Sequence, residues 1–148
     1  MLKLKKAIFC LLICFIASCT ISREVKILTP MNITDKNICV IQNSKIRYDK
    51  FHDVLLQELE KKGYIPRLVQ TEEKCDLYLK FNAEWQWDMA YYLTDVDFNL
   101  YQSDKHIANA KYHVAGGSKN MLLWYKYRTS QTIISNMLDM LEVELINN

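Results

Sequence analysis

The stretch that decides the fold is Cys75-Asp-Leu-Tyr-Leu-Lys-Phe-Asn-Ala-Glu-Trp-Gln-Trp87. Its odd positions are all apolar, whereas its even positions are mostly polar. Side chains of a β-strand point alternately to its two faces, so this pattern predicts a long strand with one buried and one solvated face. We therefore expect Trp85 and Trp87 to lie on the inward face, packed in the core under helices.

Shorter patterns on either side predict the other elements. Branched apolar residues predict short strands, and apolar residues at helical spacing predict two helices. The predicted elements are strands at 37–42, 65–70, 75–87, 93–101 and 107–114, and helices from Asp49 to Gly63 and from Thr129 or Ser130 to Leu145. Nearly every element has one apolar face to bury. We expect an α+β fold, namely a two-layer α/β sandwich with a mostly antiparallel sheet of about five strands and two helices, in the order strand, helix, strands, helix.

The last two strands also suggest a register. A three-residue turn at Ser103-Asp104-Lys105 would place Asp97 opposite Lys111 and Asp95 opposite His113. Opposite charges across a ladder stabilise the pairing by a few tenths to about 1 kcal/mol. A shift of one residue would turn the aspartates into the core, so we expect this register.

Residues 1–18 have the features of a bacterial lipoprotein signal peptide. Three lysines near the start precede an apolar run that is shorter than the ~20 residues needed to span a bilayer. Ile16-Ala17-Ser18-Cys19 then has the branched, small, small, cysteine order of a lipobox. We expect cleavage before Cys19 and attachment of diacylglycerol and palmitate there. The alternative is a plain signal peptide or short anchor in which Cys19 is incidental.

The rest of the chain divides into a tether and one domain. Residues 19–36 are polar, contain Pro30 and show no sustained period, so we expect a tether that could reach ~50 Å from the membrane. Part of it could instead lie on the domain or add an edge strand. Residues 37–148 are then a single domain, large enough to bury a core.

The charge balance argues against nucleic acid as a partner. Removing the three signal lysines leaves 16 basic residues against 17 acidic ones, so the formal charge falls from +2 to −1. Lys126 and Arg128 stand among tyrosines, but two cations make a weak phosphate site. We expect no nucleic-acid partner.

Cys39 and Cys75 are the two cysteines that remain in the mature domain. A pair of cysteines in an exported protein favours a disulfide. Two buried free thiols are an alternative. A metal site is disfavoured because neither cysteine has a CxxC spacing or a nearby histidine. We expect neither a metal nor a cofactor.

No motif predicts catalysis. Asp95, Asp97 and His113 could in principle do acid-base chemistry, as an enzyme acting on envelope substrates would require. On an exposed face in high dielectric, however, a solvated role is the more common one. Gly116-Gly117-Ser118 lacks the strand-to-helix context of a nucleophile elbow, and residues 115–128 carry no pattern that predicts a structure.

The aromatic excess suggests a binding surface. Trp87, Asp88 and Trp124 could converge at one edge of the sandwich and contact an envelope protein. Contact with lipid headgroups is a rival use, since tryptophan and tyrosine favour that interface. A third reading is a small-ligand or lipid-binding module in which aromatic residues line a groove between sheet and helices.

Short pieces along the chain also resemble a known group of proteins. They are Ile16-Ala17-Ser18-Cys19-Thr20, Ile38-Cys39-Val40-Ile41 followed by Asn43, Cys75, Trp87-Asp88, Tyr92-Leu93, Leu100-Tyr101, Ala110-Lys111-Tyr112-His113 and Gly116-Gly117. In these the chain resembles small, uncharacterised Gram-negative lipoproteins first catalogued from Shewanella. The resemblance implies a Gram-negative cell envelope and a bridge between Cys39 and Cys75, and it implies no activity.

The residue after the lipidated cysteine bears on the membrane. Thr20 is not the aspartate that retains lipoproteins in the inner membrane of enteric bacteria. We therefore expect attachment to the outer membrane, facing the periplasm.

Overall fold

The computed structural model describes residues 20–30, 33–46, 50–72, 75–87, 91–115 and 129–147. The predicted signal peptide and the predicted lipidation site Cys19 lie outside the described residues, as do Asp49, Asp88 and Trp124. Within the described part, no helix has the length and apolarity needed to cross a membrane.

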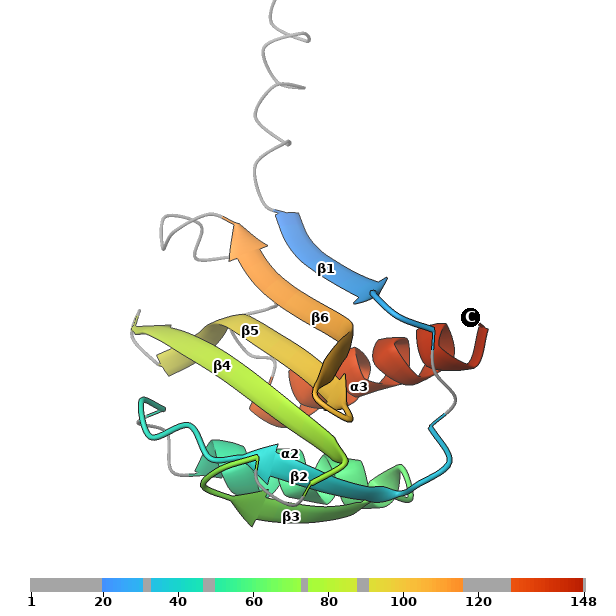
Figure 1. Cartoon of the computed structure of the whole chain (residues 1–148). Coiled ribbons are helices and arrows are strands. Elements are labelled where there is room, and N and C mark those ends of the chain that lie inside the picture. The colour runs from blue at the N-terminus through green and yellow to red at the C-terminus, as the bar shows by residue number, and fades with distance from the viewer. Residues whose placement is uncertain are drawn as a thin grey trace, which may run out of the picture.

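Six strands and two helices make up the described chain (Figure 1). In chain order they are β1 (Thr20–Ile27), β2 (Asn37–Ile41), α2 (Lys50–Lys61), β3 (Ile65–Val69), β4 (Leu77–Trp87), β5 (Tyr91–Gln102), β6 (Lys105–Ala115) and α3 (Ser130–Asn147). The strands form one sheet in the order β1-β6-β5-β4-β2-β3.

This sheet corrects the predicted fold. A two-layer sandwich with a mostly antiparallel sheet of about five strands is wrong, because the sheet has six strands and is mixed. β2 runs parallel to both of its neighbours, β3 and β4, and the other pairs are antiparallel. The parallel pair arises because α2 carries the chain from the end of β2 back to the start of β3, as a crossover helix does.

β1 is the strand that the sequence interpretation missed. It occupies part of the segment predicted as a tether, and its whole length pairs with residues 108–115 of β6, from Thr20 opposite Ala115 to Ile27 opposite Ala108. Ile21, Val25 and Ile27 are partly buried against the core, whereas the polar residues between them are exposed. The tether prediction is therefore wrong over residues 20–27, and the alternative of an added edge strand describes them.

α2 ends as its sequence predicts. Gly63 has a φ of +80°, the left-handed conformation that glycine adopts without a Cβ penalty. Its amide donates to the Glu60 carbonyl at 2.9 Å, and the Tyr64 amide donates to the Leu59 carbonyl at 3.1 Å. These two bonds form a Schellman motif, which turns the chain directly into β3.

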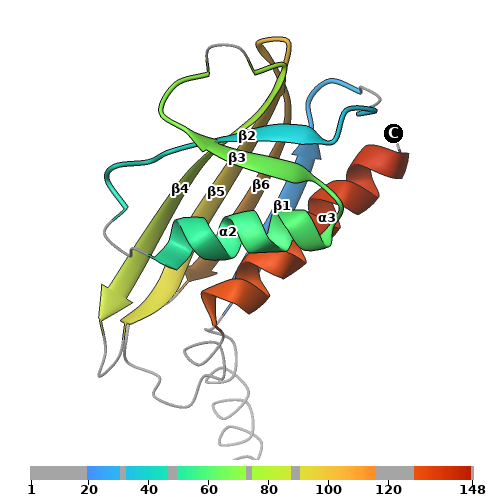
Figure 2. The same cartoon turned by 90° about the horizontal axis from the view of Figure 1, so that it is seen from below.

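Both helices lie on one face of the sheet (Figure 2). The inward residues of β4 are buried there as the alternation predicts: Leu77, Leu79, Phe81 and Ala83. The Phe51 ring of α2 stacks on Phe81 with centroids 5.4 Å apart. The core therefore occupies the space between this face and the helices, and the opposite face of the sheet carries polar side chains.

The predicted register of β5 and β6 is confirmed. Asp97 pairs with Lys111, and Asp95 pairs with His113. The turn is shorter than predicted: Ser103 and Asp104, with φ of +48° and +62°, join the strands. A shift between Leu100 and Tyr101 compensates for the missing turn residue, so the pairing beyond it is the predicted one.

Candidate interaction surfaces

Two exposed aromatic side chains stand at the junction of β4 and β5. Trp87 ends β4, Tyr91 begins β5, and the two are cross-strand partners. Trp87 is 65% exposed and Tyr91 is 68% exposed. We call this pair the aromatic tip. Large exposed aromatic groups of this kind typically mark contact surfaces.

The exposure of Trp87 corrects its predicted place in the core. Trp85 is inward and partly buried, with its ring edge-on to Phe51 at 5.4 Å. Phe51 lies in the first turn of α2, which begins at Lys50. Two further residues carry the strand ~7 Å beyond Trp85. The alternating pattern predicts the direction of a side chain, but it does not reveal where the covering helix ends.

A bulge accompanies this end of the hairpin. The register shifts between Glu84 and Trp85, which leaves Thr94 as an extra residue on β5. The buried Thr94 hydroxyl donates to the Glu84 carbonyl at 3.2 Å. Bulges increase local twist and redirect side chains, so this one helps set the orientation of the aromatic tip.

The aromatic tip lies at the end of the sheet where β1 begins. Thr20 pairs with Ala115 at the end of β6, and β5 starts at this same end (Figure 2). Strands lie ~4.8 Å apart, so β5 is ~10 Å and β4 ~14 Å across the sheet from β1. The residue that precedes Thr20 in the sequence is Cys19.

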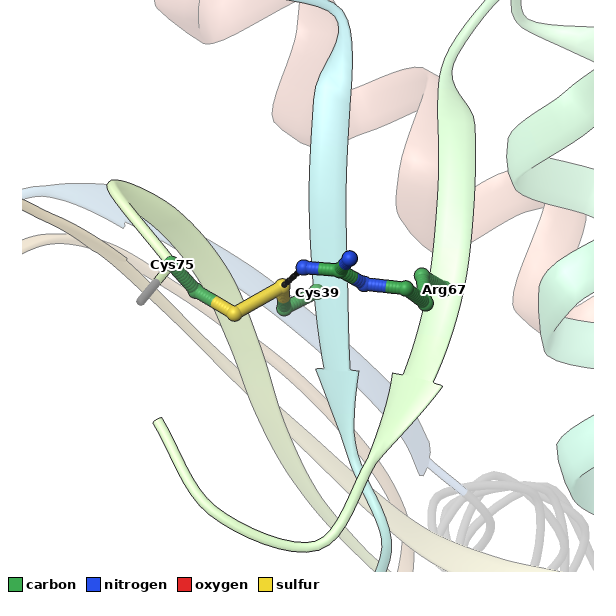
Figure 3. Close-up of a disulfide and its surroundings, with 3 residues drawn as sticks. All are labelled: Cys39, Arg67 and Cys75. Atoms are coloured by element: carbon green, nitrogen blue, oxygen red, sulfur yellow. Dashed lines mark hydrogen bonds between the residues drawn. A yellow bond between two sulfur atoms is a disulfide. The ribbon is translucent and has the colours of Figure 1, made fainter. Parts of the chain in front are cut away.

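The other end of the sheet contains the disulfide. Cys39 and Cys75 are joined, with Cα atoms 6.0 Å apart and a sequence separation of 36. Figure 3 shows Arg67 reaching from β3 to this bridge, and its Nη2 lies 3.6 Å from the Cys39 Sγ. The predicted bridge is therefore present, and it links the short strand β2 to the segment just before β4.

Aromatic residues at this bridged end are packed and hydrogen-bonded. Tyr78 is only 3% exposed, and its ring stacks on Tyr101 with centroids 5.0 Å apart. Its hydroxyl donates to Asp104 Oδ1 at 3.2 Å. Burial raises the pKa of Tyr78 to about 12, and the adjacent Asp104 carboxylate acts in the same direction. We call Cys39, Cys75, Tyr78, Tyr101 and Asp104 the bridged end.

The face opposite the helices carries a shallow groove of about 360 Å³. Asp95 Oδ1 contacts His113 Nδ1 in this groove, and Lys111 Nζ lies 3.7 Å from Asp97 Oδ2. The charged and amide side chains that line it, which we call the polar face, are Asn82, Glu84, Asp95, Asp97, Lys111 and His113.

The polar face brings together the three residues considered for acid-base chemistry. Asp95, Asp97 and His113 each have more than a third of the side chain exposed. Their neighbours are other solvated polar groups, and the groove is open to water. The arrangement agrees with the solvated interpretation, since the described residues around these groups form an open groove and leave the side chains more than a third exposed. Among the residues that the structure describes, no three histidine, cysteine or carboxylate side chains are grouped as metal ligands.

A buried asparagine supports this face from within the sheet. The Asn109 amide nitrogen lies 2.6 Å from Asp97 Oδ1 and 3.1 Å from the Phe98 carbonyl oxygen. It also contacts Asn99 Oδ1 at 3.0 Å. These contacts fix the Asp97 carboxylate beside Lys111, so the charge pattern of the groove is held by the sheet itself.

The interior between sheet and helices contains a small cavity. It measures about 20 Å³ and is lined mainly by leucines, including Leu59, Leu79 and Leu138. Pockets for small molecules measure roughly 300–1,000 Å³. This cavity is therefore too small for the ligand that the small-ligand or lipid-binding interpretation places between sheet and helices.

Of the three residues predicted to form a partner surface, the structure describes only Trp87. Trp87 is at the surface, as a contact role requires, whereas Asp88 and Trp124 lie outside the described residues. Sequence reasoning missed Tyr91 as the partner of Trp87. The available signal was the short segment Asp88-Met-Ala between two alternating runs, which is the length of a hairpin connection and would place Tyr91 opposite Trp87. It also missed the position of β1 beside this tip.

Comparison with known proteins identifies the fold and no family. No protein-family profile matches the sequence, and no curated protein matches it. Two solved structures of the PelC dodecamer from Paraburkholderia phytofirmans, one of a single-substitution variant, are similar, with TM-scores of 0.55 and 0.54. They are 11% and 10% identical to this chain and cover 85% of it and 97% of their own length. The likeness shows that this arrangement of sheet and helices occurs elsewhere.

Proposed function

We propose that the chain is a lipoprotein of the bacterial cell envelope that acts as a non-catalytic binding or assembly accessory. It is anchored through Cys19 to the outer membrane and faces the periplasm. The lipobox and the Thr20 that follows it support the anchor. The binding surface is the polar face, and the envelope partner is a protein with complementary charge.

The observation that carries this proposal is the layout of the sheet. One face is covered by α2 and α3, and the polar face carries charge pairs between β5 and β6, with Glu84 of β4 opposite Asp95. Cross-strand contacts and Asn109 hold these charges in fixed positions. Fixed complementary charges give an interface specificity and faster association.

Site-specific photocrosslinking in intact cells tests this surface. A photoreactive amino acid at Glu84, which is exposed and lines the groove, should capture a defined envelope protein. The same group at Gln57, exposed on α2, is the matched control and should not capture it. Equal capture at both positions, or none at Glu84, would contradict the proposed surface.

The anchor has its own test. Cys19→Ser removes the thiol that takes the lipid, so it should abolish labelling with radiolabelled palmitate and release the protein from the membrane fraction. Acyl chains contribute about 0.8 kcal/mol per buried methylene, so loss of two or more chains leaves little affinity. Normal palmitate labelling of Cys19→Ser would refute lipidation at this residue.

A second candidate function is self-assembly through the edge strand β3. Ile65 is 63% exposed and Leu68 is 39% exposed on this strand, and no described strand pairs with its outer side. Open apolar edges are templates for pairing with another chain. The PelC dodecamers provide a precedent for assembly by this fold, and the proposal itself rests on the edge.

A further inference from the structure

We propose that the aromatic tip inserts into the headgroup layer of the membrane that holds Cys19, so that the domain stands on the bilayer tip first. This inference rests on the proposed lipidation of Cys19. It adds a lipid-binding surface, Trp87 with Tyr91, and an orientation for the whole domain.

The proposed anchor and the sheet are separated by a single peptide bond. β1 begins at Thr20, one residue after Cys19. One residue spans at most ~3.6 Å, whereas the expected tether could have spanned ~50 Å. The start of β1 is hydrogen-bonded along β6, so the anchor is joined to the rigid sheet. Lipidation of Cys19 would therefore hold this end of the sheet against the bilayer surface.

The aromatic tip is at the anchored end of the sheet. β4 ends and β5 begins at the end of the sheet where β1 begins (Figure 2), and Trp87 and Tyr91 are the terminal residues of β4 and β5 there. They are ~10–14 Å to the side of β1, as the strand spacing gives. The anchor and the aromatic tip thus form two points of contact with a single plane.

The two side chains of the aromatic tip have the chemistry that suits a headgroup layer. Tryptophan and tyrosine combine an apolar ring with a polar tip and are enriched at membrane interfaces. Trp87 and Tyr91 are both about two-thirds exposed, and because they are cross-strand partners they lie next to each other. A headgroup layer takes both the rings and the polar atoms. The short anchor brings that layer to the aromatic tip, which makes lipid the favoured occupant over a protein.

The consequence is a defined direction for the rest of the domain. β5 has 12 residues and runs from the aromatic tip to the bridged end. A strand of this length spans roughly 35–40 Å. The bridged end would then lie far from the bilayer, and the polar face would stand along the membrane normal, open to partners in the periplasm.

Quenching by brominated lipids tests the inference. The precursor is expressed in Gram-negative cells, and the mature protein is purified in detergent and reconstituted in phosphatidylethanolamine and phosphatidylglycerol vesicles. Bromines near the headgroup end of the acyl chains should quench a component of the tryptophan emission. Trp87→Phe should lose that component, whereas the control Trp85→Phe should retain it, because Trp85 packs on Phe51. Equal quenching of wild type and Trp87→Phe would overturn the inference.

A second measurement needs no substitution at Trp87, so it applies even if Trp87→Phe folds poorly. Acrylamide is a water-soluble quencher. It should quench Trp87 in the unlipidated wild-type protein in detergent-free solution, and it should no longer quench Trp87 in the lipidated protein on vesicles. Unchanged access in vesicles would contradict insertion without any substitution in the tip.

The mass of the N-terminal peptide from the same sample separates this inference from the proposed function. A lipidated peptide with quenched Trp87 supports both. A lipidated peptide without quenching at Trp87 overturns the orientation and leaves the lipoprotein proposal standing. An unmodified Cys19 overturns both.

Discussion

Both ends of the sheet carry aromatic side chains, but these are buried at the bridged end and exposed at the aromatic tip. At the bridged end, Tyr78 is buried, stacked on Tyr101 and hydrogen-bonded to Asp104, beside a covalent bridge. At the aromatic tip, Trp87 and Tyr91 are mostly exposed. The first arrangement stabilises the fold, whereas the second leaves apolar area available for a contact.

The difference indicates two roles, stabilisation of the fold at the bridged end and contact with a partner surface at the aromatic tip. Tyr78 stands at an even position of β4 and Trp87 at an odd one, so the alternation predicts an exposed Tyr78 and a buried Trp87, and the structure shows the reverse for both. Replacing residues at the bridged end should change the free energy of unfolding. Replacing residues at the aromatic tip should change membrane contact and leave that free energy nearly unchanged.

The largest expected effect comes from removing the disulfide. Cys39→Ala with Cys75→Ala frees a loop with a sequence separation of 36 residues, which should lower the free energy of unfolding by roughly 4 kcal/mol in the chain-entropy model. The matched double variant at the other end, Trp87→Ser with Tyr91→Ser, should change it by less than about 0.5 kcal/mol. Urea denaturation of the unlipidated mature chain measures both.

Similar losses in these two double variants would break the contrast. They would mean that Trp87 and Tyr91 contribute to the core although they are exposed.

A smaller effect should follow from Tyr78→Phe. This change removes the hydroxyl that donates to Asp104 and keeps the stacked ring, so we expect a loss of about 1 kcal/mol. Tyr91→Phe is the control with an exposed hydroxyl and should have no measurable effect. Urea denaturation would contradict the account if Tyr91→Phe cost as much as Tyr78→Phe.

The bridged end should also show an alkaline dependence. The folded pKa of Tyr78 is about 12, above the ordinary value of 10, so the folded state favours the neutral phenol. This contribution is fully present below pH 10 and is lost as the pH rises through 12. Wild-type stability should therefore fall between pH 10 and 12 more steeply than that of Tyr78→Phe. Parallel pH profiles for the two proteins would show that Tyr78 is not the group responsible.

The smallest effect on stability is expected at the edge strand β3, whose exposed residues belong to neither the bridged end nor the aromatic tip. Ile65→Lys with Leu68→Lys should leave the free energy of unfolding within about 0.5 kcal/mol, because both side chains are exposed. If β3 mediates self-assembly, this variant should be monomeric in light scattering after size exclusion while the wild type is larger. Identical masses would count against assembly through β3.

The three long strands β4, β5 and β6 show what a sequence can predict. Its inward residues Leu77, Leu79 and Phe81 are buried, and Asp97 faces Lys111, because a period of two fixes both the face and the register once one face must be dry. The end of α2 was also predictable, because Gly63 supplies a backbone conformation that few residues tolerate.

The features that were not predicted depend on contacts between distant parts of the chain. The pattern of β1 is weak, and only pairing with β6 makes Thr20–Ile27 a strand. The parallel placement of β2 depends on how α2 packs. Trp87 is exposed because the strand outruns the helix that covers Trp85. The aromatic tip is therefore a result of tertiary structure, and of its two residues only Trp87 was singled out from the sequence.

The central claim is that the domain stands on the membrane by its aromatic tip, and energy transfer to a headgroup acceptor tests it most directly. A fluorescent amino acid is placed either at Gln86, beside the aromatic tip, or at Lys105, near the bridged end, in the lipidated protein on vesicles. The account predicts strong transfer from position 86 and weak transfer from position 105, since a 12-residue strand separates the two ends by roughly 35 Å. Equal transfer from both positions would mean that the sheet lies flat or tumbles, and it would contradict the claim.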